Sequence, residues 1–186
     1  MSLRVIAGKA KGRRLKAVDG DTTRPITDRA KESLFNILGG DVIDSNWWDL
    51  FGGTGAVGIE ALSRGAKFVR FSELNRAPIE TIQYNLKHCK LETQSEIRRA
   101  DSFAYLANAP DMHFEYVYIA PPQYKEMWIK ALELLDGNIE WLTDDGWTIV
   151  QIAPREYRES TPFLTNLEEF EKRQYGNTLF VFYKRK

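Results

Sequence analysis

The sequence predicts an α/β fold with a doubly wound, mostly parallel sheet of seven strands that ends in an antiparallel hairpin. Two observations indicate this fold. Between residues 47 and 152, short β-prone segments alternate with amphipathic helical segments, a pattern typical of strands connected through helices. The last two β-prone segments instead flank Gly176-Asn177, a pair suited to a tight turn. With 186 residues, we expect one domain spanning 1–186.

The first 40 residues are predicted to form a small β-hairpin and a helix. The hairpin is indicated by two β-prone segments around glycines. The helix is indicated by an apolar stripe at helical spacing, which begins after a capping residue and ends at a glycine pair. The segments are Arg4–Ala7 and Arg13–Ala17 for the hairpin, and Thr27 or Asp28 to Leu38 for the helix.

The rest of the chain supplies the alternating core and the closing hairpin. The predicted core strands are Trp47–Phe51, Phe68–Leu74, Glu96–Ala100, Glu115–Ala120 and Trp147–Ile152. The predicted helices are Ala56–Arg64, Ala77–Cys89, Phe103–Ala107 and Lys125–Leu135, and the hairpin pairs Glu168–Tyr175 with Thr178–Tyr183. A parallel sheet ended by such a hairpin is the Rossmann-like layout of class I methyltransferases. Simple dinucleotide-binding folds usually lack the hairpin.

The charge is distributed unevenly although the formal net charge is zero. Residues 1–36 carry nine basic and four acidic side chains, and segment 4–16 alone carries six basic side chains and no acidic one. Such a segment is either a contact for a polyanion or a solvated hairpin. One cysteine and two histidines argue against a disulfide or a protein-built metal site. Without a membrane-length apolar run or a signal-peptide pattern, we expect a cytoplasmic protein.

The first predicted core strand ends in a glycine turn. Gly53-x-Gly55-x-x-Gly58, with Glu73 twenty residues after Gly53, matches the fingerprint of dinucleotide sites. This spacing alone leaves an NAD-dependent oxidoreductase open. Asp49, just before the turn, suits the ammonium group of S-adenosylmethionine and would face a pyrophosphate unfavourably. Together with the terminal hairpin, Asp49 therefore favours S-adenosylmethionine.

Each of the next two strands also ends in an acidic residue. Glu73 is placed to accept hydrogen bonds from both ribose hydroxyls. Asp101, followed by Ser102, either accepts from the adenine amine or caps the next helix. The residues expected to bind the cofactor are Asp49, Phe51, Gly52, Gly53, Thr54, Gly55, Glu73, Leu74, Asp101 and Ser102.

Three segments resemble the RsmD-type 16S ribosomal RNA guanine-N2 methyltransferases. They are Arg4–Leu15, Thr23–Leu38 and Asp49–Ala66. The resemblance implies an enzyme that methylates the exocyclic amine of a guanine, with S-adenosylmethionine as donor and ribosomal RNA or the assembling small subunit as partner. It also implies that the basic segment contacts RNA, through Arg4, Lys9, Lys11, Arg13, Arg14, Arg24 and Thr27.

The sequence departs from the family at the end of the fourth strand. The family motif is Asp-Pro-Pro followed by Tyr or Phe, whereas this chain reads Ala120-Pro121-Pro122-Gln123-Tyr124. In this motif the acidic side chain and a proline carbonyl orient the amine, and the aromatic ring stacks on the base. We expect these five residues to form the catalytic segment. The substitution leaves open an active enzyme with substitute groups, a changed target such as DNA adenine, or a protein that binds cofactor and RNA without methylating.

Overall fold

A seven-stranded sheet in the order β3-β2-β1-β4-β5-β7-β6 forms the centre of the protein. The computed structural model describes residues 3–18, 26–123, 126–159 and 163–186. β7 alone runs against the other strands of this sheet, pairing antiparallel with both β5 and β6. The strands are β1 (Asn46–Asp49), β2 (Phe68–Glu73), β3 (Ser95–Arg99), β4 (Phe114–Ile119), β5 (Leu142–Ile152), β6 (Leu167–Tyr175) and β7 (Thr178–Arg185). The predicted fold class is confirmed.

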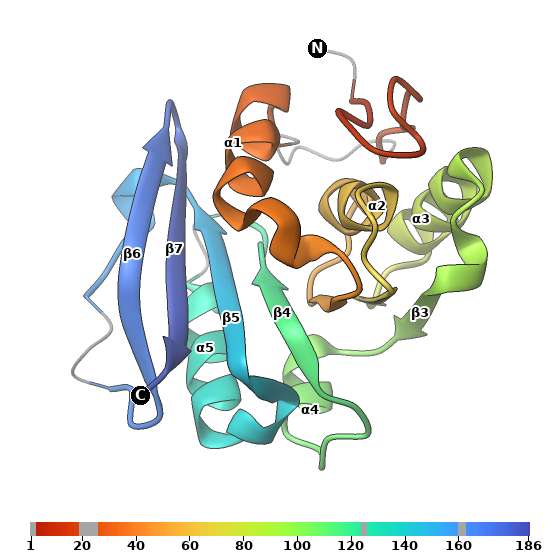
Figure 1. Cartoon of the computed structure of the whole chain (residues 1–186). Coiled ribbons are helices and arrows are strands. Elements are labelled where there is room, and N and C mark those ends of the chain that lie inside the picture. Colours follow the sequence, from red (N-terminus) through yellow and green to blue (C-terminus); the bar gives the residue numbers. More distant parts are fainter. Residues whose placement is uncertain (1–2, 19–25, 124–125, 160–162) are drawn as a thin grey trace.

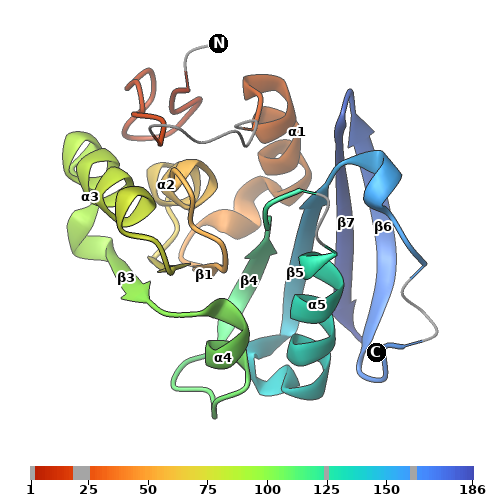
Figure 2. The same ribbon diagram turned by 180° about the vertical axis from the view of Figure 1, so that it is seen from behind.

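Helices cover both faces of the sheet. One face carries α1, α2 and α3 (Figure 1), and the opposite face carries α4 and α5 (Figure 2). The helices are α1 (Asp28–Leu38), α2 (Ala56–Ser63), α3 (Arg76–Cys89), α4 (Ser102–Leu106) and α5 (Met127–Gly137). Short 3-10 helices are η1 (Gly39–Val42), η2 (Glu92–Gln94), η3 (Ile139–Trp141) and η4 (Pro154–Glu156). None of the helices in the described ranges has both the length and the apolar character needed to cross a membrane.

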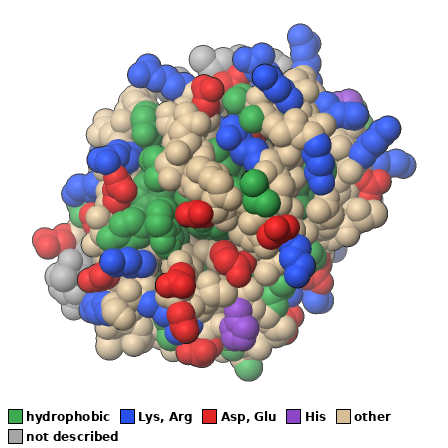
Figure 3. Space-filling model, in the orientation of Figure 1, with side chains coloured by type: hydrophobic (Ala, Val, Ile, Leu, Met, Phe, Trp, Pro, Cys, Tyr) green, Lys and Arg blue, Asp and Glu red, His purple; other side chains and the backbone are tan. Residues whose placement is uncertain are grey.

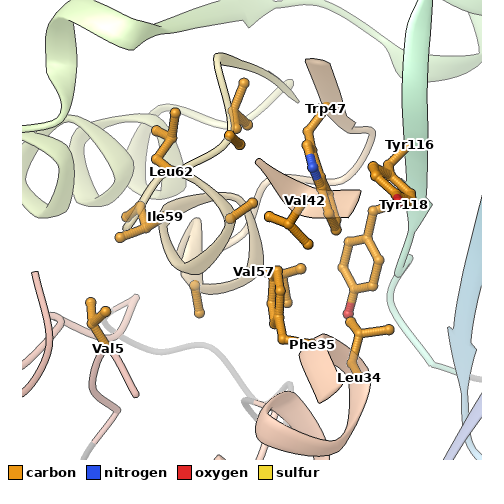
Figure 4. Close-up of a cluster of buried hydrophobic side chains, with 14 of the residues drawn as sticks. Val5, Leu34, Phe35, Val42, Trp47, Val57, Ile59, Leu62, Tyr116 and Tyr118 are labelled. Atoms are coloured by element: carbon orange, nitrogen blue, oxygen red, sulfur yellow. The ribbon is translucent and has the colours of Figure 1, made fainter. Parts of the chain in front are cut away.

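The helix α1 begins and ends as predicted. The Thr27 hydroxyl accepts a hydrogen bond from the Ala30 N–H at 3.2 Å, which satisfies one of the free donors of the first turn. Gly39 ends the helix with a φ of 57°, a left-handed conformation that favours glycine. The apolar stripe of α1 packs on the sheet, where the Phe35 ring stacks on Trp47 at 5.5 Å (Figure 4). α1 is thereby held beside the first strand.

A second core lies under α4 and α5. The Trp48 and Trp141 rings pack at 4.6 Å, and both are essentially excluded from solvent. Their indole N–H groups are satisfied, because Trp48 donates to the Ser72 hydroxyl and Trp141 to the Leu106 carbonyl. With both faces buried, the strands hold fixed positions at the edge where their carboxyl ends meet.

The two predicted N-terminal segments pair as a hairpin, but they are shorter than predicted and do not form full strands. Only one bridge forms, between Arg4 and Arg14. Across the pair, the N–H groups of Val5, Gly12 and Leu15 donate to the carbonyls of Arg13, Val5 and Leu3, whereas other N–H groups of this segment donate to α2. Glu60 accepts from the N–H groups of Ile6 and Ala7. The Ser63 carbonyl accepts from the N–H of residue 9, and the Ser63 hydroxyl accepts from the N–H of residue 10. The segment is therefore an extension of the core and not a free hairpin.

Other boundaries differ slightly from the predictions. β5 begins at Leu142, five residues before the predicted Trp147, because Leu142 pairs with Phe114 across a register shift in β4. Lys125, the predicted start of the last predicted helix, lies outside the described residues. The remaining elements agree with the predictions to within about two residues at each end.

Candidate active site

A cleft of about 1510 Å³ opens at the carboxyl ends of the parallel strands. In Figure 1 this is the edge toward which the arrows of β4 and β5 point. The chain reverses its direction of winding between β1 and β4, and open α/β sheets bind ligands at such a switch point. One half of the cleft is formed by the segments after β1, β2 and β3. The other half is formed by the segments after β4 and β5 and by the β6–β7 turn.

The glycine turn after β1 lines the first half. Gly53 and Gly55 have φ values of 52° and 74°, which other residues rarely adopt. A Cβ on Gly53 would meet only the Phe51 carbonyl, at 3.8 Å, so its outer side is open to a ligand. A Cβ on Gly58 would lie 2.4 Å from the Phe71 ring, so this glycine allows α2 to approach β2 closely. Gly52, Gly53 and Thr54 thus offer backbone to the cleft, whereas Gly55 does not line it.

Asp49 lies beside this turn with one unsatisfied carboxylate oxygen. Its side chain is 2% exposed, and its Oδ1 atom has no hydrogen-bond partner. Burial, and secondarily the charge of Glu73, raise the pKa of Asp49 well above its usual range, although backbone N–H groups of Gly58 and Phe51 partly oppose this. A buried carboxylate without a counter-charge is costly. The structure therefore presents an acceptor that a ligand cation would satisfy.

Glu73 is fixed in the same half of the cleft by the backbone. Its Oε2 accepts from the Gly53 N–H at 3.2 Å, and its Oε1 accepts from the N–H groups of Leu74 and Asn75 at 2.9 and 3.0 Å. A carboxylate has about four acceptor positions, so Glu73 can still accept from ligand hydroxyls. These three hydrogen bonds hold the segments after β1 and β2 together as one wall of the cleft.

The end of β3 makes structural contacts as well as lining the cleft. Asp101 caps α4 by accepting from the N–H groups of Phe103 and Ala104, at 2.8 and 3.2 Å. The Ser102 hydroxyl donates to the Leu50 carbonyl. The capping alternative for Asp101 is therefore realised in the structure. Sequence reasoning missed Phe103, whose ring contacts Phe51 at 5.8 Å to form an apolar wall of the cleft.

The second half of the cleft contains the altered motif. Ala120, Pro121, Pro122 and Gln123 line it, and Tyr124 lies outside the described residues. Because Ile119 pairs with Val150, Ala120 and Gln151 follow side by side at the ends of β4 and β5.

Sequence reasoning also missed Gln151 and its partner Tyr118. The Tyr118 hydroxyl donates to Gln151 Oε1 inside the cleft. Burial, followed by the charge of Asp49, raises the pKa of Tyr118 well above its usual value, so the phenol keeps its proton. A polar residue at the carboxyl end of the apolar segment 147–152 was the signal that could have identified Gln151.

The basic residues expected to contact substrate lie mostly outside the cleft. Thr27 lines it, but the basic side chains of segment 4–14 do not. Arg4 pairs with Asp28 at 2.8 Å, and Lys9 and Arg13 bond to Gln94 and to the His88 carbonyl. Lys11 and Arg14 are exposed and have no ion pair with any other described residue. Arg24 lies outside the described residues.

No group of three His, Cys, Asp or Glu side chains within the described ranges is arranged to hold a metal ion. The donor set of the first half instead fits an organic ligand. Asp49 suits a cationic group, Glu73 suits a pair of hydroxyls, and the walls formed by Leu74, Phe51 and Phe103 suit a flat ring.

Comparison with known proteins places the chain in a family. The family model described as Conserved hypothetical protein 95 matches residues 3–184. The YlbH protein of Bacillus subtilis is 38% identical over 186 residues, covering 99% of this chain and 100% of that protein. Ribosomal RNA small subunit methyltransferase D of Haemophilus influenzae is 35% identical over 151 residues, covering 80% of this chain and 78% of the relative.

The solved structures agree with the sequence comparisons. The Escherichia coli protein yhhF superposes with a TM-score of 0.86 at 27% identity, covering 100% of this chain and 99% of that chain. The chain therefore belongs to the RsmD-type family of ribosomal RNA methyltransferases.

Proposed function

We propose that this chain is an S-adenosylmethionine-dependent methyltransferase that methylates the exocyclic N2 amine of a guanine in small-subunit (16S) ribosomal RNA. The observation that carries the proposal is the buried, unpartnered Oδ1 of Asp49 beside an open glycine turn. A ligand cation would satisfy this oxygen, and the amino acid part of S-adenosylmethionine carries one. The name of the Haemophilus relative supports ribosomal RNA as the substrate.

The first half of the cleft would hold the donor. Asp49 would bind the ammonium group, Glu73 the ribose hydroxyls, and the apolar wall of Leu74 and Phe103 the adenine ring. When bound, S-adenosylmethionine supplies an electrophilic methyl group on a sulfonium centre. The backbone N–H groups that hold Glu73, together with the packing of Gly58, keep these groups preorganised, so little ordering is required on binding.

The second half of the cleft would orient the target amine. The nitrogen of a guanine amine is conjugated with the ring and is a weak nucleophile, so acceptors are needed to direct it. Ala120 has no side-chain acceptor, but the carbonyls of Ala120 and Pro121 remain. We propose Gln151 as the substitute group, because its amide oxygen lies on the neighbouring strand and is held by Tyr118. A carbonyl oxygen has two lone pairs, so Oε1 can accept from the amine as well as from Tyr118.

The alanine at position 120, where the family motif has aspartate, favours a second candidate function. A protein with an intact donor half and a weakened acceptor half could bind cofactor and RNA and act in subunit assembly without methylating. In that case Gln151 would not compensate for the missing carboxylate.

One experiment tests the proposal and separates the two candidates. The purified protein is incubated with methyl-labelled S-adenosylmethionine and unmodified small-subunit RNA, both free and in partly assembled subunits. Nuclease digestion followed by mass spectrometry identifies the product, which we expect to be N2-methylguanosine. Label on another nucleoside would refute the guanine assignment. RNA and cofactor binding without label transfer would establish the second candidate.

A further inference from the structure

The aromatic ring of Tyr84 is exposed on the outer side of α3. Large hydrophobic side chains that are mostly exposed among the described residues are Ile43, Leu74 and Tyr84. Leu74 lines the cleft, and Ile43 packs near Gly65. Tyr84 is 55% exposed, and α3 faces the core with other residues, among them Ile82 and Leu86. The fold therefore gives no packing reason for this ring.

His88 supports the Tyr84 ring from one side. The two rings are nearly parallel, with an interplanar angle of 7° and centroids 5.9 Å apart, one helical turn from each other. A stacked pair of this kind restricts the rotation of Tyr84 and leaves its other face to solvent. It therefore presents a flat, preoriented surface.

Basic residues lie near this surface. The Arg13 guanidinium donates to the His88 carbonyl, and Lys87 is exposed beside it on the same helix. The backbone of Lys16 is tied to Asn85, which accepts from its N–H at 2.7 Å and donates to its carbonyl at 3.0 Å. Figure 3 shows Lys and Arg side chains gathered over the N-terminal segment and the adjoining end of α3. A flat aromatic face with basic side chains near it matches the bases and phosphates of single-stranded RNA.

Asn85, buried beneath this surface, ties it to the cleft. The Asn85 side chain also donates to the carbonyl of Thr54, which lines the cleft, at 2.9 Å. Ala17 and Val18, the residues after Lys16, line the cleft as well. A strand that places one nucleotide in the cleft can thus pass Lys16 and reach Tyr84 without leaving the protein surface.

We infer that Tyr84, stacked on His88 and flanked by Arg13, Lys16 and Lys87, binds an unpaired base of the RNA substrate next to the target nucleotide. This inference rests on the proposed function, because it assumes that the cleft receives an RNA nucleotide. It adds a second contact, outside the cleft, that distinguishes single-stranded substrate from a duplex.

Substitution of Tyr84 tests the inference. Tyr84→Ala and Tyr84→Leu remove the ring, Tyr84→Trp keeps a stacking face, and Gln83→Ala is a matched control at an exposed neighbouring position. RNA affinity is measured by fluorescence anisotropy at one fixed salt concentration, with a small-subunit RNA fragment. Calorimetric titration with S-adenosylhomocysteine confirms that each variant is folded.

The expected result is RNA binding weakened about fivefold to a hundredfold in Tyr84→Ala and Tyr84→Leu, and unchanged within about twofold in Tyr84→Trp and Gln83→Ala. Cofactor affinity should be the same in all four variants. RNA binding by Tyr84→Ala equal to that of the unmodified protein would overturn the inference and leave the proposed function standing. Failure of the unmodified protein to bind any RNA would overturn both.

Discussion

The Nζ atom of Lys31 lies 3.3 Å from Oε2 of Glu60, and both side chains are completely buried. Glu60 also accepts from the N–H groups of Ile6 and Ala7 and from Arg64, and Lys31 donates to the Arg4 carbonyl. One buried ion pair therefore attaches both α1 and the basic N-terminal segment to α2. α2 begins directly after the glycine turn, so the pair links the proposed RNA contact to the proposed cofactor site.

Removing one member of this pair should destabilise the protein strongly. Glu60→Gln leaves the Lys31 ammonium buried without a counter-charge, so we expect a loss of about 3–5 kcal/mol in the free energy of unfolding. The double variant Lys31→Met, Glu60→Gln should recover part of that loss, because no unpaired ammonium remains. Urea unfolding of the single and double variants measures the coupling. Additive effects would show that the two groups do not stabilise each other.

Asp49→Asn should stabilise the free protein while weakening cofactor binding. The pKa of Asp49 is raised in the folded state, so its ionisation opposes folding and wild-type stability falls as the pH rises from about 4 toward the folded pKa. We therefore expect the variant to have the higher Tm at pH 8, by a margin that shrinks as the pH falls. Its affinity for S-adenosylhomocysteine should be about tenfold to a hundredfold lower, because a charge-assisted hydrogen bond is lost.

Thermal unfolding with and without S-adenosylhomocysteine, at several pH values, measures both effects. Asp44→Asn is a suitable control, because this acidic residue is exposed and outside the cleft. Equal cofactor affinity in Asp49→Asn and the unmodified protein would exclude Asp49 as the ammonium ligand.

Gln151 should determine the rate of methyl transfer and not the affinity for the donor. Gln151→Leu removes the amide beside Ala120, so we expect kcat to fall about tenfold, the equivalent of one net hydrogen bond of ~1.4 kcal/mol. Tyr118→Phe should give a smaller loss, since it frees Gln151 without removing it. Single-turnover methylation with saturating donor measures the effect.

Ala120→Asp provides the complementary test of the acceptor half. If Gln151 substitutes for the missing carboxylate, Ala120→Asp should restore activity to Gln151→Leu. A rate unaffected by Gln151→Leu would contradict this role. Activity that appears only after Ala120→Asp would identify the natural protein as a binding module.

Two glycines of the N-terminal segment should differ sharply in their tolerance of substitution. Gly8 and Gly12 have φ values of 81° and 83°, so alanine is strained at both, by about 1–2 kcal/mol. A Cβ on Gly8 would also lie 1.8 Å from the Ser63 carbonyl oxygen, whereas a Cβ on Gly12 would meet nothing within 4 Å.

Gly8→Ala should therefore cost a further ~1–3 kcal/mol and displace the basic segment from α2. RNA affinity should fall in Gly8→Ala and stay near the wild-type value in Gly12→Ala, as measured by anisotropy after chemical unfolding has given the stabilities. Equal behaviour of the two variants would show that docking on α2 is not needed for RNA binding.

The sequence was most informative where the pattern is local. Thr27 and the glycines after Leu38 mark the ends of α1 in the sequence. In the structure, Thr27 caps the start of the helix and Gly39 ends it. The strands were found because alternation and β-branched residues act over a few neighbouring positions. The N-terminal hairpin is shorter than predicted, since some of its backbone N–H groups donate to residues far along the chain, here Glu60 and Ser63.

For the site, the sequence determined the chemical types and their order along the chain: the glycine turn, Asp49, Glu73 and the altered segment at Ala120. Only the tertiary structure decided which of these groups are already satisfied. Oδ1 of Asp101 already accepts from two N–H groups of α4, whereas Oδ1 of Asp49 is buried without a partner. The tertiary structure also decided that Gln151 lies beside Ala120. Neighbouring strands of a parallel sheet come from segments separated by a crossover, and their register depends on the packing of both faces of the sheet.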